Sequence, residues 1–250
     1  FRAINPWHTL APAVILLGVL GGVVAAADLG TALVLVATAL TLFFVAGLEK
    51  KYILTAVAVA VPVACIVIAM KPYRLARMVG FFDPEYKYIA VIDRGGWVKS
   101  HVQKSLATRD TSYQPKQSRI AIGSGGAVGL GLGQGKQKLL YLPEAHTDFI
   151  YAVVGEELGL LGATGVLAGF IIILWRGLRL FWLAPDNFGR YLALGVTVSV
   201  VVQALINMSV VLDIGPTKGF PLPMISYGGS SLLSTLTSMG ILLSVSEHSG

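Results

Sequence analysis

The segment from residue 10 to residue 48 is apolar almost throughout and carries one charged side chain, Asp28, near its middle. A helix rises 1.5 Å per residue, so this segment would extend about 58 Å, nearly twice the roughly 30 Å of a bilayer hydrocarbon core. Helices satisfy their own backbone hydrogen bonds within lipid. We therefore expect two membrane-crossing helices, with Asp28 at a tight turn on the membrane surface.

Further apolar segments bring the expected number of spans to six, at about 53–70, 149–174, 190–212 and 222–245. The composition agrees, because 55% of the residues are hydrophobic and only 13% are charged. This pattern predicts an all-α fold, a polytopic transmembrane helical bundle forming a single integral-membrane domain over residues 1–250. The chain begins at Phe1 without a signal-peptide pattern, and we expect a fragment that lacks its own N-terminus.

The basic residues indicate the orientation of the bundle rather than binding to nucleic acid, which we do not expect as a partner. One set of short connections contains six Lys or Arg side chains, and the opposite set contains only Lys218. The positive-inside rule makes the first side cytoplasmic. The long loop at about 71–148 then lies outside the membrane, on the same face as Asp28, Asp148, Asp213 and Lys218.

The long loop has aromatic and aliphatic residues that make full disorder unexpected, so we predict a partly helical loop on the membrane surface, with a helix near 97–108. Its glycine-rich end, "GSGGAVGLGLGQGK", fits neither dinucleotide-binding nor Walker spacing. We expect a turn-rich or re-entrant segment in which glycine permits close backbone approach.

Ionisable residues gather where this loop enters the next apolar run, in "YLPEAHTDFIYAVVGEELGLLGA". Asp148 could cap the following helix, as could Thr147. Alternatively, Asp148 could take a proton as a general base, with Glu144 and His146 nearby to tune it. Lys218, expected on the same face, could contact an anion or simply reach toward water at the interface.

Four other charged residues have two interpretations each. Glu156 and Glu157 lie about two turns into the apolar run, and we expect one of them to face the bundle interior or a water-filled cavity. The alternative is a structural pairing with a basic residue or backbone group. Arg74 and Arg77, at the external start of the long loop, could contact an anion or anchor the span to headgroups.

Several separated motifs make the chain similar to one family. The glutamate-containing stretch above occurs together with "ADLGTALVLVATALTLFFVAG", "KPYRLARMVGFFDP", "QSRIAIGSGGAVGLGLGQGKQK" and "GPTKGFPLPMISYGGSS". In their order along the chain, these motifs closely resemble those of the SEDS family (shape, elongation, division and sporulation), which includes the FtsW, RodA and SpoVE proteins. The motifs look closer to the division branch. The segment at about 85–111 departs from the family, whose members often have a short connection there.

The resemblance implies a peptidoglycan glycosyltransferase that polymerises lipid II at the outer face of the bacterial cytoplasmic (inner) membrane, in cell division or cell shape. It implies ten spans in the whole protein, Asp148 as catalytic residue and Lys218 as a functional lysine. Lys218, Arg74 or Arg77, with a divalent cation such as Mg²⁺ or Mn²⁺, would stabilise the departing pyrophosphate, while Glu144 and His146 would contact substrate or tune Asp148. In-line displacement would invert the anomeric centre.

The expected partners are lipid II, membrane lipid and a class B penicillin-binding transpeptidase. Two other functions compete with the enzyme. A lipid II flippase should keep its charged groups near the bilayer midplane, whereas here they gather at one face. A non-enzymatic division scaffold would have no need of Asp148.

Overall fold

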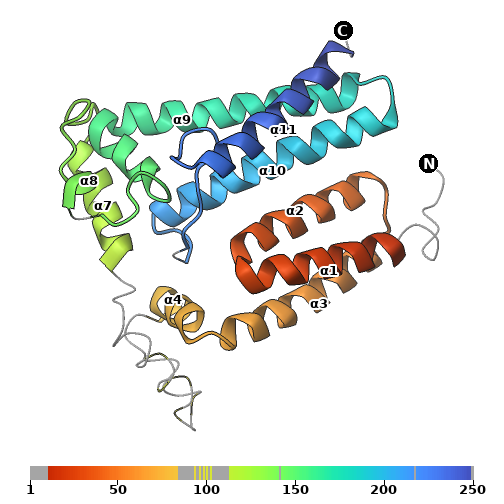
Figure 1. Ribbon diagram of the computed structural model, residues 1–250, viewed down its shortest axis with the longest axis horizontal. Coiled ribbons are helices and arrows are strands. Elements are labelled where there is room, and N and C mark those ends of the chain that lie inside the picture. Colours follow the sequence, from red (N-terminus) through yellow and green to blue (C-terminus); the bar gives the residue numbers. More distant parts are fainter. Residues whose placement is uncertain are drawn as a thin grey trace. The chain divides into compact units, whose positions relative to one another are not determined.

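The computed structural model describes residues 11–83, 93, 96, 98, 100, 102, 113–140, 142–216 and 218–248. Within these residues the chain is helical and contains no strand, which confirms the predicted all-α class. Figure 1 shows the helices α1 (Ala11–Ala27), α2 (Leu29–Val45), α3 (Lys50–Ala69), α4 (Pro72–Phe82), α7 (Tyr113–Gly125), α8 (Gln137–Leu140), α9 (Ile150–Leu183), α10 (Asn187–Val211) and α11 (Gly229–Glu247).

Four of these helices, α3, α9, α10 and α11, are long and apolar enough to cross a membrane. Two more apolar helices, α1 and α2, have 17 residues each. These six helices correspond to the six expected spans and confirm a membrane helical bundle. Two boundaries differ from the prediction. α9 continues to Leu183, and α11 begins only at Gly229, because the described residues between α10 and Gly229 are not helical.

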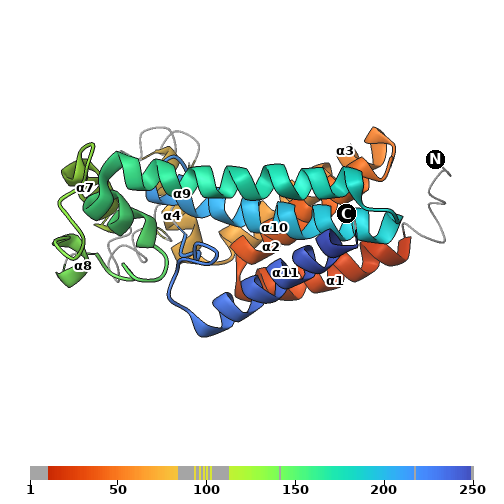
Figure 2. The same cartoon turned by 90° about the horizontal axis from the view of Figure 1, so that it is seen from above.

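The chain divides into two compact units, which are described separately. Unit 1 comprises Phe1–Ala64, Phe170–Gln203 and Leu233–Gly250. In it α1 and α2 lie side by side (Figures 1 and 2), and Asp28 separates them. Its carboxylate accepts the N–H groups of Gly30 and Thr31, each at 3.2 Å, and so caps the start of α2. The turn predicted at Asp28 is thus confirmed.

Close helix packing in unit 1 depends on a glycine of α9. A Cβ atom added at Gly177 would overlap the side chain of Thr197 on α10. Thr197 is fully buried, and its hydroxyl donates to the carbonyl of Ala193 at 2.7 Å, so it cannot swing aside without losing that bond. Small residues at such positions let membrane helices approach closely.

Unit 2 comprises Cys65–Gly169 and Ala204–Leu232 and contains the motifs singled out in the sequence. Helix α7 joins other parts of this unit, because Ser118 donates its hydroxyl to the carbonyl of Val211 at 2.7 Å and Arg119 lies 3.3 Å from the Asp213 carboxylate. A separate apolar cluster forms where Ala76 and Val79 of α4 pack with Val102.

The long loop is partly helical, as predicted, since it includes α4, α7 and α8. Of the helix expected near 97–108, only Val98, Ser100 and Val102 are described, and all three are helical. The rest of that expected helix, and most of the 85–111 segment, lies outside the described residues.

We predict that Gly177→Ala destabilises the protein by about 1–3 kcal/mol, since the added methyl group overpacks the contact with Thr197. Gly169→Ala is the matched control, because nothing lies within 4 Å of a Cβ atom at that position of the same helix. The control should be neutral or slightly stabilising, since alanine favours helix over glycine. Thermal unfolding in detergent, followed by intrinsic fluorescence, measures both. Equal melting temperatures for the two variants would contradict the proposed contact.

Candidate functional site

Helix α9 is interrupted near its start, at Gly159, whose φ of 64° and ψ of −160° are not helical. A residue with a Cβ atom would be strained at this φ and would also meet the backbone of Ala127 and Gly129. Figure 2 shows the change of direction where α9 begins beside α7. The interruption places the first turns of α9 against the glycine-rich segment at 125–136.

The glycine-rich segment replaces the helix's own hydrogen bonds at this break. In an unbroken helix the N–H groups of Leu160 and Leu161 would bond to the carbonyls four residues earlier. Here they donate to the carbonyls of residues 126 and 127, at 2.9 and 3.2 Å. The carbonyls of residues 156 and 157 accept instead the N–H groups of Leu130 and Gly131, both at 3.0 Å. The expected close backbone approach is therefore confirmed.

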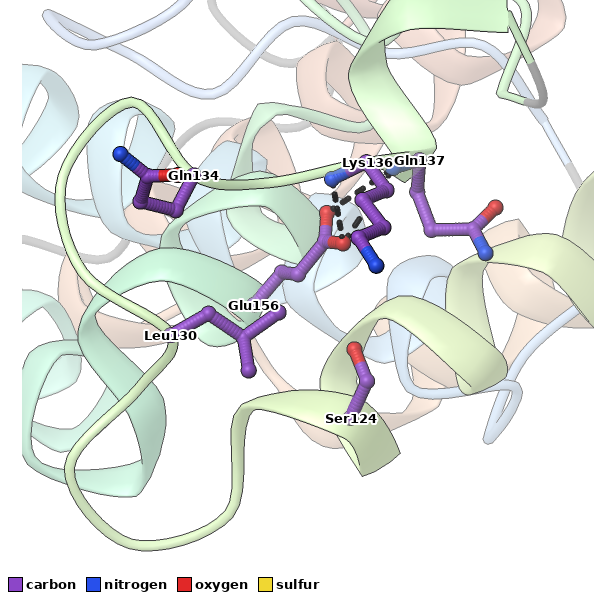
Figure 3. Close-up of a pocket in the computed structure, with 6 residues that line it drawn as sticks. All are labelled: Ser124, Leu130, Gln134, Lys136, Gln137 and Glu156. Atoms are coloured by element: carbon purple, nitrogen blue, oxygen red, sulfur yellow. Dashed lines mark hydrogen bonds between the residues drawn. The ribbon is translucent and has the colours of Figure 1, made fainter.

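Glu156 is almost fully buried, at 1% exposure, and its carboxylate points toward the end of the glycine-rich segment. It accepts the backbone N–H of Lys136 at 2.8 Å and that of Gln137 at 3.2 Å (dashed lines in Figure 3). Hydrogen bonds to a charged acceptor are stronger than neutral ones. They make burial of this carboxylate tolerable.

Glu157 is also buried, at 8% exposure, and binds the same segment one residue further along α9. Its carboxylate accepts the N–H groups of Gly133 at 3.0 Å and Gly135 at 3.3 Å, and it lies 2.5 Å from the Lys138 ammonium. The sequence predicted that one of this glutamate pair faces inward. Both do: Glu156 binds backbone N–H groups, and Glu157 binds backbone N–H groups and the basic side chain of Lys138.

A cavity of about 580 Å³ opens beside Glu156. Figure 3 shows the side chains around it, which come from the end of α7, the glycine-rich segment and α9: Ser124, Leu130, Gln134, Lys136, Gln137 and Glu156. Because the Glu156 carboxylate already binds two backbone N–H groups, it acts here as a structural acceptor.

The turn at residues 146–148 carries the predicted catalytic aspartate. The backbone carbonyl of each of its three residues accepts a hydrogen bond from another part of unit 2. The carbonyl of His146 accepts the N–H of Tyr227 at 2.9 Å. The carbonyl of Thr147 accepts the hydroxyl of Ser226 at 2.6 Å. The carbonyl of Asp148 accepts the side-chain NH₂ of Asn207 at 2.7 Å. Three donors from the end of α10 and the following loop thus fix this turn.

The same turn is also closed from within. Glu144 has a positive φ of 58°, uncommon for a residue with a side chain, and its carbonyl accepts the N–H groups of residues 147–149 at 3.1–3.2 Å. Its carboxylate accepts the hydroxyl of Thr147 at 2.9 Å. The side chains of Glu144 and His146 are exposed. Strained, over-determined backbone of this kind gathers at functional sites.

The half-buried Asp148 side chain lies against the backbone of the 218–222 segment. A Cβ atom added at Gly219 would overlap the Asp148 carboxylate, so the absence of a side chain at 219 permits this approach. Lys218 is the preceding residue and is half-buried. The structure therefore brings the carboxylate of Asp148 next to the chain segment that carries Lys218, although 70 residues separate them in the sequence.

The two predicted arginines are half-buried on α4, in unit 2. The guanidinium of Arg77 stacks over the ring of Tyr73, 4.2 Å from its centre. Among the described residues, no three His, Cys, Asp or Glu side chains form a group that could hold a metal ion.

Sequence reasoning missed the residues that hold the Asp148 turn, namely Asn207 and Ser226. Asn207 had a usable signal, because an amide side chain inside an apolar span is costly unless it has hydrogen-bond partners. Ser226 had none of comparable strength, since its partner, the Thr147 carbonyl, is 79 positions away.

Comparison with known proteins shows the family to which the chain belongs. The family of FtsW, RodA and SpoVE proteins, described as cell cycle proteins, matches residues 2–250. The chain belongs to this family. It is the SEDS family that the sequence motifs indicated.

Individual relatives agree with this assignment. A probable peptidoglycan glycosyltransferase FtsW of Geobacter sp. (strain M18) is 42% identical over 95% of this chain and 59% of its own length. The stage V sporulation protein E of Bacillus subtilis (strain 168) is 37% identical over 89% of this chain and 55% of its own length. The chain thus spans somewhat more than half the length of these relatives.

A solved structure also matches. A chain from a study of structural coordination of polymerization and crosslinking by a peptidoglycan synthase complex aligns with a TM-score of 0.66 and 26% identity. The alignment covers 99% of the present chain and 63% of that chain.

We predict that Glu157→Gln loosens the glycine-rich segment, because the neutral amide weakens the bonds from Gly133 and Gly135 and leaves the Lys138 ammonium without its carboxylate. The expected cost is about 1–3 kcal/mol. Hydrogen exchange should show faster exchange of the amides at 133–137, with the amides of α10 unchanged. Glu49→Gln is the control, since that carboxylate is exposed and pairs only with exposed Lys51. Unaltered protection at 133–137 would contradict the role of Glu157.

Proposed function

We propose that the protein to which this chain belongs polymerises lipid II into peptidoglycan glycan strands at the outer face of the bacterial cytoplasmic membrane. The observation that carries the proposal is the Asp148 carboxylate, held on a fixed turn and packed against Gly219, directly after Lys218. The relatives named as probable peptidoglycan glycosyltransferases support the same reaction. The positive-inside distribution supports the outer face.

In the proposed reaction Asp148 is the base. It takes the proton of the acceptor sugar hydroxyl as that oxygen forms a bond to the anomeric carbon of the donor. The bond from that carbon to the pyrophosphate oxygen breaks, and the pyrophosphate leaves with the electron pair. Attack opposite the leaving group inverts the anomeric centre. No second, nucleophilic carboxylate is needed.

The departing pyrophosphate requires positive charge, for which we propose Lys218, with Arg74 and Arg77 as further candidates. Mg²⁺ or Mn²⁺ would enter with the phosphates, which supply most of the ligands of such an ion when one or two carboxylates complete the set. The Asp148 carboxylate lies against Gly219, next to Lys218, and fits that limited donor set. Exposed Glu144 and His146 would contact the acceptor sugar.

The proposed physiological role is glycan synthesis for cell division, in a complex with a class B penicillin-binding transpeptidase. The synthase complex named for the similar solved structure supports a partner that crosslinks the strands. Against a transporter, the distinguishing charged groups gather at one face rather than near the bilayer midplane. The buried Glu156 and Glu157 bind the backbone of a loop, which supports a structural role for them.

We predict that Asp148→Asn lowers lipid II polymerisation by about 10²- to 10⁴-fold, the range for loss of a general base. The full-length protein with its transpeptidase partner is assayed on purified lipid II, at equal amounts of folded protein. Asp186→Asn is the control, since Asp186 caps the start of α10 through the N–H of Gly189 at 2.9 Å and asparagine caps equally well. Polymer from Asp148→Asn at the wild-type rate would remove Asp148 from catalysis.

Lys218→Gln should lower kcat/KM about 10²-fold, as expected for loss of one group that stabilises developing negative charge. Lys218→Arg should retain part of the activity, because it keeps the positive charge. Lys51→Gln, at an exposed lysine paired with Glu49, serves as control for charge removal. Wild-type kinetics for Lys218→Gln would instead assign Lys218 to the membrane interface.

A further inference from the structure

Asn207 is a polar residue in the last turns of α10, where its neighbours along the chain are apolar. It is 1% exposed, and the nearby Met208, Val210 and Val211 are buried as well. Burial of an amide costs free energy unless its hydrogen-bonding groups find partners. The amide must therefore contribute something that an apolar residue of the same size could not.

Its NH₂ group makes two bonds to backbone carbonyls from two different segments. One hydrogen goes to the carbonyl of Asp148 at 2.7 Å and the other to the carbonyl of Phe220 at 2.5 Å. The first acceptor lies directly before α9, and the second lies in the loop after α10. A single side chain thus bridges the two segments that meet at the proposed catalytic site.

The two bridged carbonyls flank the contact that the proposed reaction depends on. Phe220 follows Gly219, whose backbone lies against the Asp148 carboxylate. Asp148 supplies both that carboxylate and the carbonyl bound to Asn207. The amide therefore sets how far the carboxylate stands from Gly219 and from the adjoining Lys218.

The other donors to this turn act differently. Ser226 bonds to the carbonyl of Thr147 and accepts the N–H of Leu222 at 2.6 Å, while Tyr227 bonds through its backbone to His146. Ser226 thereby also joins the turn to the 218–222 segment, but at the residue before Asp148. The Asn207 amide binds the carbonyl of Asp148 itself and joins it to the carbonyl of Phe220.

We propose that Asn207 is a positioning residue for Asp148, an inference that rests on the proposed function. Its NH₂ group clamps the catalytic turn to the Lys218 segment, so that the base and the cation face one bound substrate at a fixed separation. A misplacement of about 1 Å can cost about 10²-fold in rate, even when the altered residue does not touch substrate.

Two substitutions of Asn207 test the proposal. Asn207→Leu keeps the approximate size but removes both donors, and Asn207→Ser keeps one short hydroxyl donor. Ser209→Ala is the matched control, because the Ser209 hydroxyl bonds at 2.8 Å only within its own helix, to the carbonyl of Ile206. All variants are compared in the full-length protein with its partner, at equal folded amount, with Asp148→Asn included.

For Asn207→Leu we expect a kcat lower by about 10- to 100-fold, with the KM for lipid II within about twofold of wild type, since geometry and not binding is changed. The acidic limb of its pH–rate profile should move, because the surroundings of the base change. Asn207→Ser should recover part of the kcat, and Ser209→Ala should match wild type. In the Asp148→Asn background, Asn207→Leu should have no further effect, which shows coupling of the two sites.

Three results would overturn the inference while leaving Asp148 as base: normal kcat for Asn207→Leu beside an inactive Asp148→Asn, full additivity in the double variant, or failure of both Asn207 variants to fold. The last would assign the amide to stability of the unit. Wild-type polymerisation by Asp148→Asn would instead reject the proposed function, whichever result the Asn207 variants give.

Discussion

Burial of the two neighbouring carboxylates of Glu156 and Glu157 is the constraint on which the surrounding structure depends. A carboxylate away from water is costly unless hydrogen-bond donors surround it. Here the donors are three backbone N–H groups of the glycine-rich segment and the N–H of Gln137 at the start of α8, together with the Lys138 ammonium. The glycine-rich segment in turn depends on the two carboxylates, because it has no regular secondary structure whose carbonyls would accept those N–H groups. The break of α9 at Gly159 frees the carbonyls of residues 156 and 157, which accept the N–H groups of Leu130 and Gly131 in the glycine-rich segment.

The turn at residues 146–148 also depends on hydrogen bonds that satisfy polar groups, but here the backbone carbonyls are the groups that need partners. Three donors from the end of α10 and the following loop bind these carbonyls. These bonds use the backbone of the turn and leave the role proposed for Asp148 to its side chain. If Asp148 is the base, as we propose, its fixed position means that it would not have to be reorganised when substrate arrives, which is the physical meaning of preorganisation.

Much of the fold was accessible from hydrophobic length and charge. The apolar run around Asp28 predicted two helices, and Asp28 does separate them and cap the second. The glycine-rich run predicted close backbone approach, which occurs at the Gly159 break. The prediction for the glutamate pair was incomplete, because helical geometry sends adjacent side chains about 100° apart and suggested one inward residue. A loop wrapped around the helix end accommodates both.

The sequence by itself determined which segments are helical and apolar, and it marked Asp148 and Lys218 as unusual charges near the ends of spans. These are local properties, set by composition and by the backbone's need for hydrogen bonds in lipid. Only the tertiary structure decided that Gly219 receives the Asp148 carboxylate and that Asn207 bridges the two segments. Those contacts join residues 13 to 71 positions apart. The partners of Asn207 are backbone carbonyls and the partner of the Asp148 carboxylate is a glycine backbone, groups that no sequence pattern distinguishes.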